Sequence, residues 1–189
     1  MPRPTRQQID DEIIDCAATL FARHGFRETS VQRIADAVGY SKTGLLHRYP
    51  SKEALQEAVV ERCLGEMRSV RDEVAGMAPG PARDRAAITV LAGNALRRPG
   101  LVALLLSSLL TRPDGEFAET LKLVGDAVLE AFLLTPDTAD LARLTRVTGA
   151  LGALAVARTA LREQLSADSL DHLIDVSFDA LGHRDPAAS

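Results

Sequence analysis

Apolar residues recur every three or four positions along nearly the whole of this 189-residue chain. Such spacing places them on one face of an α-helix, and no segment shows the two-residue alternation of a half-buried strand. The clearest stripe consists of Leu55, Val59, Cys63, Met67, Val70 and Val74. The pattern therefore predicts an all-α fold.

Capping residues, glycines and prolines divide the pattern into about nine helices. The predicted ranges are 6–24, 30–37, 41–48, 51–75, 82–97, 100–111, 115–134, 137–164 and 167–181. The clearest linker is the segment 76–81, Gly-Met-Ala-Pro-Gly-Pro. We predict an N-terminal domain over residues 1–52, connected by helix 51–75 to a C-terminal domain over residues 76–189.

Charge is distributed unevenly between these predicted domains. The chain has a net charge of −4, but residues 1–52 hold eight Lys and Arg against six Asp and Glu, a net charge of +2. The remainder is therefore acidic. A small basic region suits DNA, although one protomer would bind it weakly, so DNA binding predicts a dimer.

Several other classes of protein lack their signatures here. No apolar run reaches the ~18 residues of a membrane span. The first fifteen residues include four acids, unlike a signal peptide, so we expect a cytoplasmic protein. Cys16 and Cys63 lack metal-binding spacing, and the histidines are dispersed. We expect no enzymatic activity, metal or cofactor, since the chain has no Glu-x-x-His, nucleophile elbow or phosphate loop.

Residues 30–49, SVQRIADAVGYSKTGLLHRY, combine two short predicted helices with a tight turn. The small side chain of Ala35 permits a close helix crossing, Gly39 tolerates a positive φ, and Leu45 helps to bury the crossing. This is the pattern of a helix-turn-helix, whose second helix enters the DNA major groove. Short helices around a glycine also occur in purely structural domains, and the motif alone leaves that alternative open.

The stretch GFRETSVQRIADAVGYSKTGLLHRYPSKEALQEAVV, residues 25–60, resembles the TetR family of transcriptional regulators. The resemblance implies a homodimeric repressor that binds a pseudo-palindromic operator and is released by a small-molecule effector. One alternative is a DNA-binding regulator without such an effector. A more remote alternative is a helical-bundle enzyme or metal carrier.

The resemblance also implies a DNA-contacting role for the matching residues, with helix 41–48 as the recognition helix. These residues are Thr29, Ser30, Gln32, Arg33, Tyr40, Ser41, Lys42, Thr43, Gly44, His47, Arg48 and Lys52. Three positions depart from the family pattern. Leu46 replaces the usual Tyr and loses its phosphate contact, Tyr40 replaces Val, and Arg48 replaces His or Tyr. For Arg33 and Arg48, solvated or ion-paired side chains are the alternative interpretation.

The resemblance implies effector binding and dimerisation for the C-terminal domain. Candidate effector-binding residues are Asn94, Ser107, Ser108 and Arg158, although satisfied structural polar groups are the alternative. Few aromatic residues, 4% of the chain, favour an aliphatic or small amphipathic effector. The predicted dimer interface comprises Leu144, Val147, Leu151, Leu154, Leu170, Leu173, Ile174 and Phe178. The alternative is that both stripes belong to the core of one chain.

Overall fold

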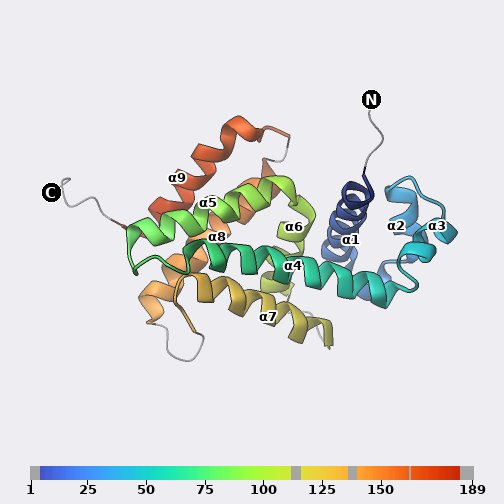
Figure 1. Ribbon diagram of the computed structural model, residues 1–189, viewed down its shortest axis with the longest axis horizontal. Helices are drawn as coiled ribbons and strands as arrows, with labels where there is room; N and C mark the ends of the chain where they lie inside the picture. The colour runs from blue at the N-terminus through green and yellow to red at the C-terminus, as the bar shows by residue number, and fades with distance from the viewer. Residues whose placement is uncertain (1–4, 112–115, 136–139, 162, 184–189) are drawn as a thin grey trace. The chain divides into compact units, whose positions relative to one another are not determined.

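The computed structural model describes residues 5–111, 116–135, 140–161 and 163–183 (Figure 1). Within these ranges the chain forms α-helices and no strand, which confirms the all-α prediction. The helices are α1 (Arg6–Glu28), α2 (Val31–Ala37), α3 (Lys42–Arg48), α4 (Lys52–Val74), α5 (Pro81–Arg97), α6 (Pro99–Thr111), α7 (Glu116–Ala131), α8 (Leu141–Ala160) and α9 (Leu170–Ala180). A short 3-10 helix, Ala167–Ser169, precedes α9.

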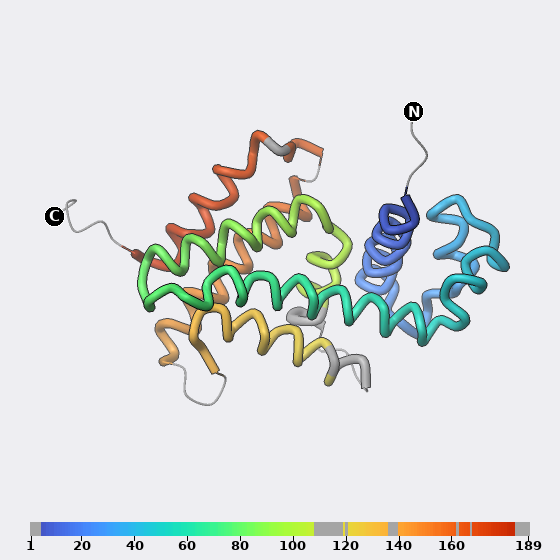
Figure 2. Tube along the Cα trace, in the orientation of Figure 1, coloured from blue at the N-terminus to red at the C-terminus, as the bar shows by residue number. Residues whose placement is uncertain are grey.

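The helices pack into two compact units. Unit 1 comprises Met1–Cys63 and Arg98–Leu121, and unit 2 comprises Leu64–Arg97 and Lys122–Ser189. The long helix α4, a continuous coil in Figure 2, contributes residues to both. Packing thus groups α6 with the N-terminal helices, whereas the division predicted from the sequence follows chain order.

The core of unit 1 forms where α1 packs against α6. The buried face of α1 contains Ile13, Ile14, Ala17, Ala18 and Phe21. Along α4, all six residues of the predicted stripe from Leu55 to Val74 are at most 6% exposed. Burying such side chains contributes roughly 1.5–3 kcal/mol for each large one. The helical periodicity therefore identified the buried face of α4 correctly.

Helix α1 is interrupted at Gly25, directly after its predicted end at residue 24. Gly25 has φ 77° and ψ 160°, outside helical geometry, and one more turn follows up to Glu28. The hydroxyl of Thr29 donates to the carbonyl oxygens of Gly25, at 2.8 Å, and Leu20, at 3.2 Å. These bonds satisfy carbonyl groups that the interruption leaves without helical partners.

Unit 2 is built around the packing of α8 against α9, with α5 against both. Three predicted helix ends differ from the structure. Helix α7 ends at Ala131 instead of residue 134, because Leu133 adopts a positive φ of 59°. Helix α8 ends at Ala160 instead of residue 164, and the first three residues of the predicted helix 167–181 form the 3-10 helix that precedes α9. No glycine marks these ends, so the sequence lacked the usual stop signal.

No single helix in the described ranges is long and apolar enough to cross a membrane. Helices α5 and α6 (the latter up to Ser107) reach that length and composition only when they are taken together.

Candidate nucleic-acid interface and ligand-binding residues

Two seven-residue helices, α2 and α3, begin at serine caps. The Ser30 hydroxyl accepts a hydrogen bond from the backbone N–H of Arg33 at 3.1 Å. The Ser41 hydroxyl accepts one from the backbone N–H of Gly44 at 3.0 Å. Each cap contributes about 1 kcal/mol, which matters because helices this short are unstable alone.

The turn between α2 and α3 is closed by backbone geometry. Gly39 has a φ of 72°, a conformation that favours glycine, and the Tyr40 N–H donates to the carbonyl oxygen of Ala35 at 2.9 Å. Ala35 and Leu45 are both 0% exposed, as is Ile34. The two helices are therefore held as one rigid element.

The outer face of this element is polar. On α3, Lys42, Thr43, Gly44 and His47 are exposed, and so is the cap Ser41. On α2, the exposed predicted residues are Gln32 and Arg33, preceded by Ser30. The Gln32 Nε2 donates to the Asp36 carboxylate at 2.7 Å, which orients the amide. Tyr40 is half-buried.

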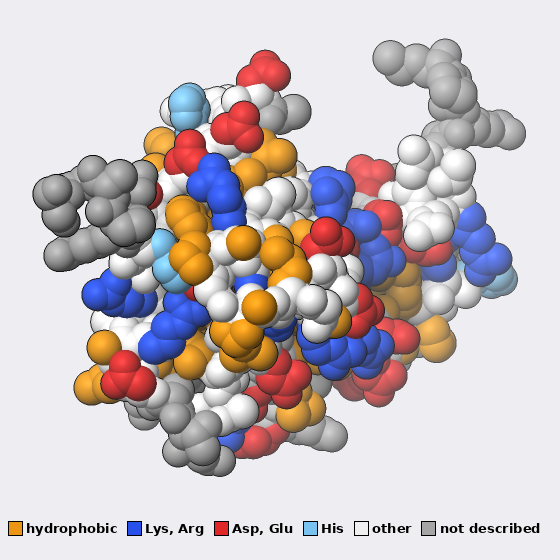
Figure 3. Space-filling model, turned by 60° about the vertical axis from the view of Figure 1, so that its left-hand side comes forward, with side chains coloured by type: hydrophobic (Ala, Val, Ile, Leu, Met, Phe, Trp, Pro, Cys, Tyr) orange, Lys and Arg blue, Asp and Glu red, His pale blue; other side chains and the backbone are white. Residues whose placement is uncertain are grey.

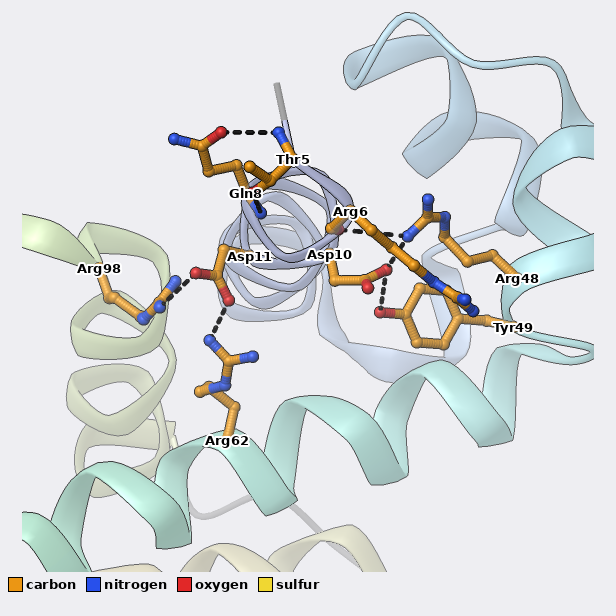
Figure 4. Close-up of polar contacts among 9 residues, drawn as sticks. All are labelled: Thr5, Arg6, Gln8, Asp10, Asp11, Arg48, Tyr49, Arg62 and Arg98. Atoms are coloured by element: carbon orange, nitrogen blue, oxygen red, sulfur yellow. Dashed lines mark hydrogen bonds and ion pairs between the residues drawn. The ribbon is translucent and has the colours of Figure 1, made fainter. Parts of the chain in front are cut away.

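Arg48 points back toward α1 rather than outward (Figure 4). Its guanidinium forms an ion pair with Asp10, and its Nη1 lies 3.5 Å from the carbonyl oxygen of Arg6. The Tyr49 hydroxyl donates to the same Asp10 carboxylate at 3.4 Å. Burial and the nearby Asp10 charge raise the pKa of Tyr49 to about 12. The ion-paired interpretation therefore describes Arg48.

Lys52 also makes contacts inside the protein. Its ammonium donates to the carbonyl oxygens of Phe26, at 3.0 Å, and Arg27, at 3.2 Å. It also lies 4.4 Å from the centre of the Phe26 ring.

Because Thr29 is 1% exposed and its hydroxyl bonds to α1, we leave Thr29 out of the proposed interface.

Asp11 on α1 joins three helical segments of unit 1 (Figure 4). Its carboxylate pairs with Arg62 of α4 and, at 2.8 Å, with Arg98 just before α6. Burial raises the pKa of Asp11, but hydrogen bonds from Arg98 and Arg62 outweigh it and lower the pKa below 3.8. Sequence reasoning missed this cluster because its members are distant in the chain.

The four predicted effector-binding residues separate in the structure. Asn94 on α5 and Arg158 on α8 both belong to unit 2. Asn94 is 6% exposed, and Arg158 Nε donates to the carbonyl oxygen of Ala95, the next residue, at 3.1 Å. Ser107 belongs to unit 1, where its hydroxyl donates to the Leu104 carbonyl at 2.8 Å. The Ser108 side chain lies outside the described part of the structure.

A cavity of about 690 Å³ in unit 2 contains none of these residues. Its polar lining includes Arg83, Asp84, Arg143, Arg146 and His183. Asp84, 2% exposed, accepts two hydrogen bonds from Arg143, at 2.8 and 2.7 Å, and lies 2.6 Å from His183 Nε2. Sequence reasoning missed this network because its partners lie 59 and 99 positions apart. Among the described residues, no three His, Cys, Asp or Glu side chains form a candidate metal site.

Arg83 stabilises helix ends around the same cavity. The guanidinium, only 5% exposed as a residue, donates to the carbonyl oxygens of Val74, Met77 and Ala131. These carbonyls end α4 and α7, where a positive charge is favourable. The cations of this cavity are thus engaged in holding unit 2 together.

The predicted dimer residues require a correction. Val147, Leu154, Leu173 and Ile174 are at most 5% exposed within one chain, because α8 and α9 pack their apolar stripes against each other. The remaining four, Leu144, Leu151, Leu170 and Phe178, are half-buried. The four buried residues therefore belong to the core of one chain, as the alternative interpretation has it. Large apolar side chains do remain exposed in unit 2, and hydrophobic groups reach the surface drawn in Figure 3.

Comparison with known proteins identifies the N-terminal segment. Residues 13–59 match the family "Bacterial regulatory proteins, tetR family". The repressor KstR2 of Rhodococcus jostii is 41% identical over 56 residues, covering 30% of this chain and 28% of that protein. The Escherichia coli regulator RutR is 37% identical over 70 residues, covering 35% of this chain and 33% of that protein. The chain thus matches no more than about a third of the length of these relatives.

Solved structures share the fold over nearly the whole chain. A TetR-family regulator from Bordetella parapertussis superposes with a TM-score of 0.65 at 23% identity, covering 92% of this chain and 93% of that one. AmtR of Mycobacterium smegmatis superposes with a TM-score of 0.63 at 21% identity, covering 100% of this chain and 93% of that one. Residues 13–59 therefore resemble the tetR family of bacterial regulatory proteins, and the chain as a whole shares the fold of these solved structures.

Proposed function

We propose that this protein is a transcriptional repressor that binds operator DNA as a homodimer and is released by a small-molecule effector. The observation that carries the proposal is the polar face of α3. Lys42, Thr43 and His47 are exposed on a helix that is capped at Ser41 and packed rigidly on α2. A helix presented in this way suits the major groove.

The individual contacts follow from side-chain chemistry. In this proposal, Lys42 and His47 on α3 meet bases or phosphates, and Gln32 on α2 reaches an adenine edge. Ser30 and Arg33 suit phosphate oxygens. Because Arg48 and Lys52 are engaged by Asp10 and by the end of α1, each protomer presents few free cations here. Two protomers are needed for strong binding, with recognition helices about 34 Å apart.

The proposed dimer surface lies on the outer faces of α8 and α9. These helices expose Leu141 by 75%, Val156 by 53% and Val176 by 60%. Gly149 and Gly152 lie on α8, and a Cβ at either would meet no described atom within 4 Å. Close approach by a second copy explains glycines that otherwise weaken a helix by about 1 kcal/mol each. We propose a two-fold symmetric interface here.

Repression and release are proposed by analogy with relatives. KstR2 is named a transcriptional repressor, and that name supports a repressing role here. Release requires an effector that prefers the conformation unable to bind DNA. A regulator without an effector would bind the same operator but respond to no ligand.

The direct test is selection of DNA ligands from a random double-stranded pool with the purified full-length protein. Fluorescence anisotropy on the selected duplex then measures affinity at several salt concentrations. We expect a pseudo-palindromic sequence, two protomers per duplex and an affinity that falls steeply as salt rises. Failure to enrich any sequence, with equal affinity for random duplexes, would overturn the proposal.

A further inference from the structure

Two buried nitrogen donors in unit 2 lack an acceptor among the described residues. They are Nδ2 of Asn94 and Nη1 of Arg158. Arg158 Nε on α8 bonds to the carbonyl oxygen of Ala95, the residue directly after Asn94. The Arg158 side chain therefore reaches α5 next to Asn94. Buried polar groups almost always have partners, so an exception of this kind indicates a missing acceptor.

Hydrogen-bond chemistry fixes the orientation of the Asn94 amide. Arg97 Nη2 contacts Asn94 Oδ1, and an arginine has donors only. The amide oxygen must therefore face Arg97, which leaves the NH₂ group as the open end. Arg158 likewise offers only donors. The unfilled hydrogen-bonding positions at this point are thus all donors, and only an acceptor can satisfy them.

Charge narrows the identity of that acceptor. The Arg97 guanidinium contacts Asn94, the Arg158 guanidinium contacts the adjacent Ala95, and no described carboxylate pairs with either. An anionic acceptor is favoured there, because hydrogen bonds to charged groups are the stronger ones. The preceding turns on the two helices contribute the buried aliphatic side chains of Leu91 and Leu154. These surroundings suit a carboxylate attached to an aliphatic body.

We propose that unit 2 binds an aliphatic carboxylate, whose oxygens accept hydrogen bonds from Asn94 Nδ2 and Arg158 Nη1. Naming this ligand as the effector rests on the proposed function. The chain itself supplies a connection, since Arg97 is followed directly by Arg98, whose guanidinium pairs with Asp11 of α1. A ligand that engages Asn94 therefore binds four residues before Arg98, and Arg97, which contacts Asn94, directly precedes it.

Thermal unfolding with a series of straight-chain carboxylates, butanoate to dodecanoate, tests the site. The matched probe for each is the alcohol of equal length. We expect at least one carboxylate to raise the melting temperature by about 5 °C when it is present far above its Kd, and its alcohol to raise it much less. Arg158→Met should abolish the difference, while Arg85→Gln should preserve it, because Arg85 is an exposed arginine paired with Asp175.

Asn94→Asp provides a second variant that preserves side-chain shape. Its carboxylate supplies the missing acceptor from within the chain, so the ligand-free variant should melt above the wild type and gain nothing from the carboxylates. The proposal is overturned if no carboxylate stabilises the protein more than its alcohol. It is equally overturned if the stabilisation survives both Arg158→Met and Asn94→Asp.

DNA-binding measurements on the same samples separate this inference from the proposed function. If the protein binds the selected duplex but no carboxylate raises the melting temperature more than its alcohol does, the proposed repressor function stands and this site fails. If a carboxylate binds through Arg158 but no DNA is recognised, the site stands and the repressor fails. If both hold, addition of the carboxylate should weaken DNA binding in the wild type and leave Arg158→Met unaffected.

Discussion

Asp15 of α1 caps the first turn of α6 by accepting a hydrogen bond from the backbone N–H of Gly100 at 2.9 Å. The Oδ1 atom of Asp15 that accepts this bond also accepts a second one, from the Leu101 N–H, at 3.2 Å. A Cβ at Gly100 would lie 1.9 Å from the carbonyl oxygen of Asp15. The close packing of α1 against α6 therefore depends on the absence of a side chain at this position.

Gly100→Ala is accordingly expected to lower the free energy of unfolding by about 2–3 kcal/mol, because the methyl group meets backbone rather than a movable side chain. Urea denaturation measures the change. Gly65→Ala on α4 is the matched control, since a Cβ at Gly65 meets nothing within 4 Å. Gly65→Ala should raise the free energy of unfolding by up to about 1 kcal/mol. Equal stability of Gly100→Ala and the wild type would contradict this account of the α1–α6 contact.

The Asp11 ion pairs predict a specific response to acid. Burial raises the Asp11 pKa, but Arg98 and Arg62 bring it below 3.8, so around that pH the native state holds fewer protons than the unfolded state. The stabilisation from the Asp11 ion pairs is present above about pH 4 and is lost as pH falls through the lower native pKa of Asp11. Asp11→Asn should therefore be less stable than the wild type at pH 7, with the difference shrinking in acid. Glu61→Gln, an exposed change on α4, should show no such convergence in urea titrations.

Tyr49 predicts a response at the opposite end of the pH range. Its native pKa is raised to about 12 by burial first and by Asp10 second. Because the native state holds this proton more tightly, the associated stability is present below about pH 10 and is lost as pH rises through 12. The tyrosinate absorbance of wild type minus Tyr49→Phe should appear only near pH 12. A difference signal complete by pH 10.5 would show that the hydroxyl is not held in this site.

Local signals in the sequence were sufficient to predict the element formed by α2 and α3. Ser30 and Ser41 cap α2 and α3, close to the predicted starts at residues 30 and 41, and Gly39 has the positive φ that the turn requires. Each of these features depends on residues within four positions. Helical periodicity likewise marked the buried face of α4 without reference to any other helix.

Contacts between distant residues were not predictable in the same way. Arg48 pairs with Asp10 across 38 positions, and Arg98 pairs with Asp11 across 87. A periodic stripe shows that a helix face is buried but not what covers it. Leu173 and Val147 were for this reason assigned to a partner chain, although α8 and α9 cover each other.

Ser177 on α9 has a buried hydroxyl without a partner among the described residues. Replacing an unsatisfied buried polar group with an apolar one of similar size removes a desolvation cost. Ser177→Ala should therefore raise the free energy of unfolding by about 1 kcal/mol, as measured in urea. Ser69→Ala is the control, because the Ser69 hydroxyl is exposed and bonds to the Glu66 carbonyl at 2.7 Å. A destabilised Ser177→Ala would indicate that the hydroxyl has a partner after all.

Lys42 and Lys52 differ in their surroundings, although the sequence predicted DNA contact for both. We expect Lys42 to contact DNA and Lys52 to support the fold. Lys42 is exposed on α3, whereas the Lys52 ammonium binds the carbonyl oxygens of Phe26 and Arg27. Lys42→Ala should weaken DNA binding across sequences and reduce the salt dependence by about two ions per dimer, at unchanged stability. Lys52→Ala should instead lower the free energy of unfolding by about 1 kcal/mol, because it removes a helix C-terminal cation and a cation–π contact.

Anisotropy at several salt concentrations and urea denaturation, on the same preparations, measure both effects for the two lysines. Lys122→Ala on α7 is the matched control, because it removes an exposed lysine from unit 2 and should change neither property. Unchanged DNA affinity in Lys42→Ala would remove α3 from the proposed interface. A reduced salt dependence in Lys52→Ala, at full stability, would instead show that Lys52 exchanges its carbonyl partners for a phosphate when DNA binds.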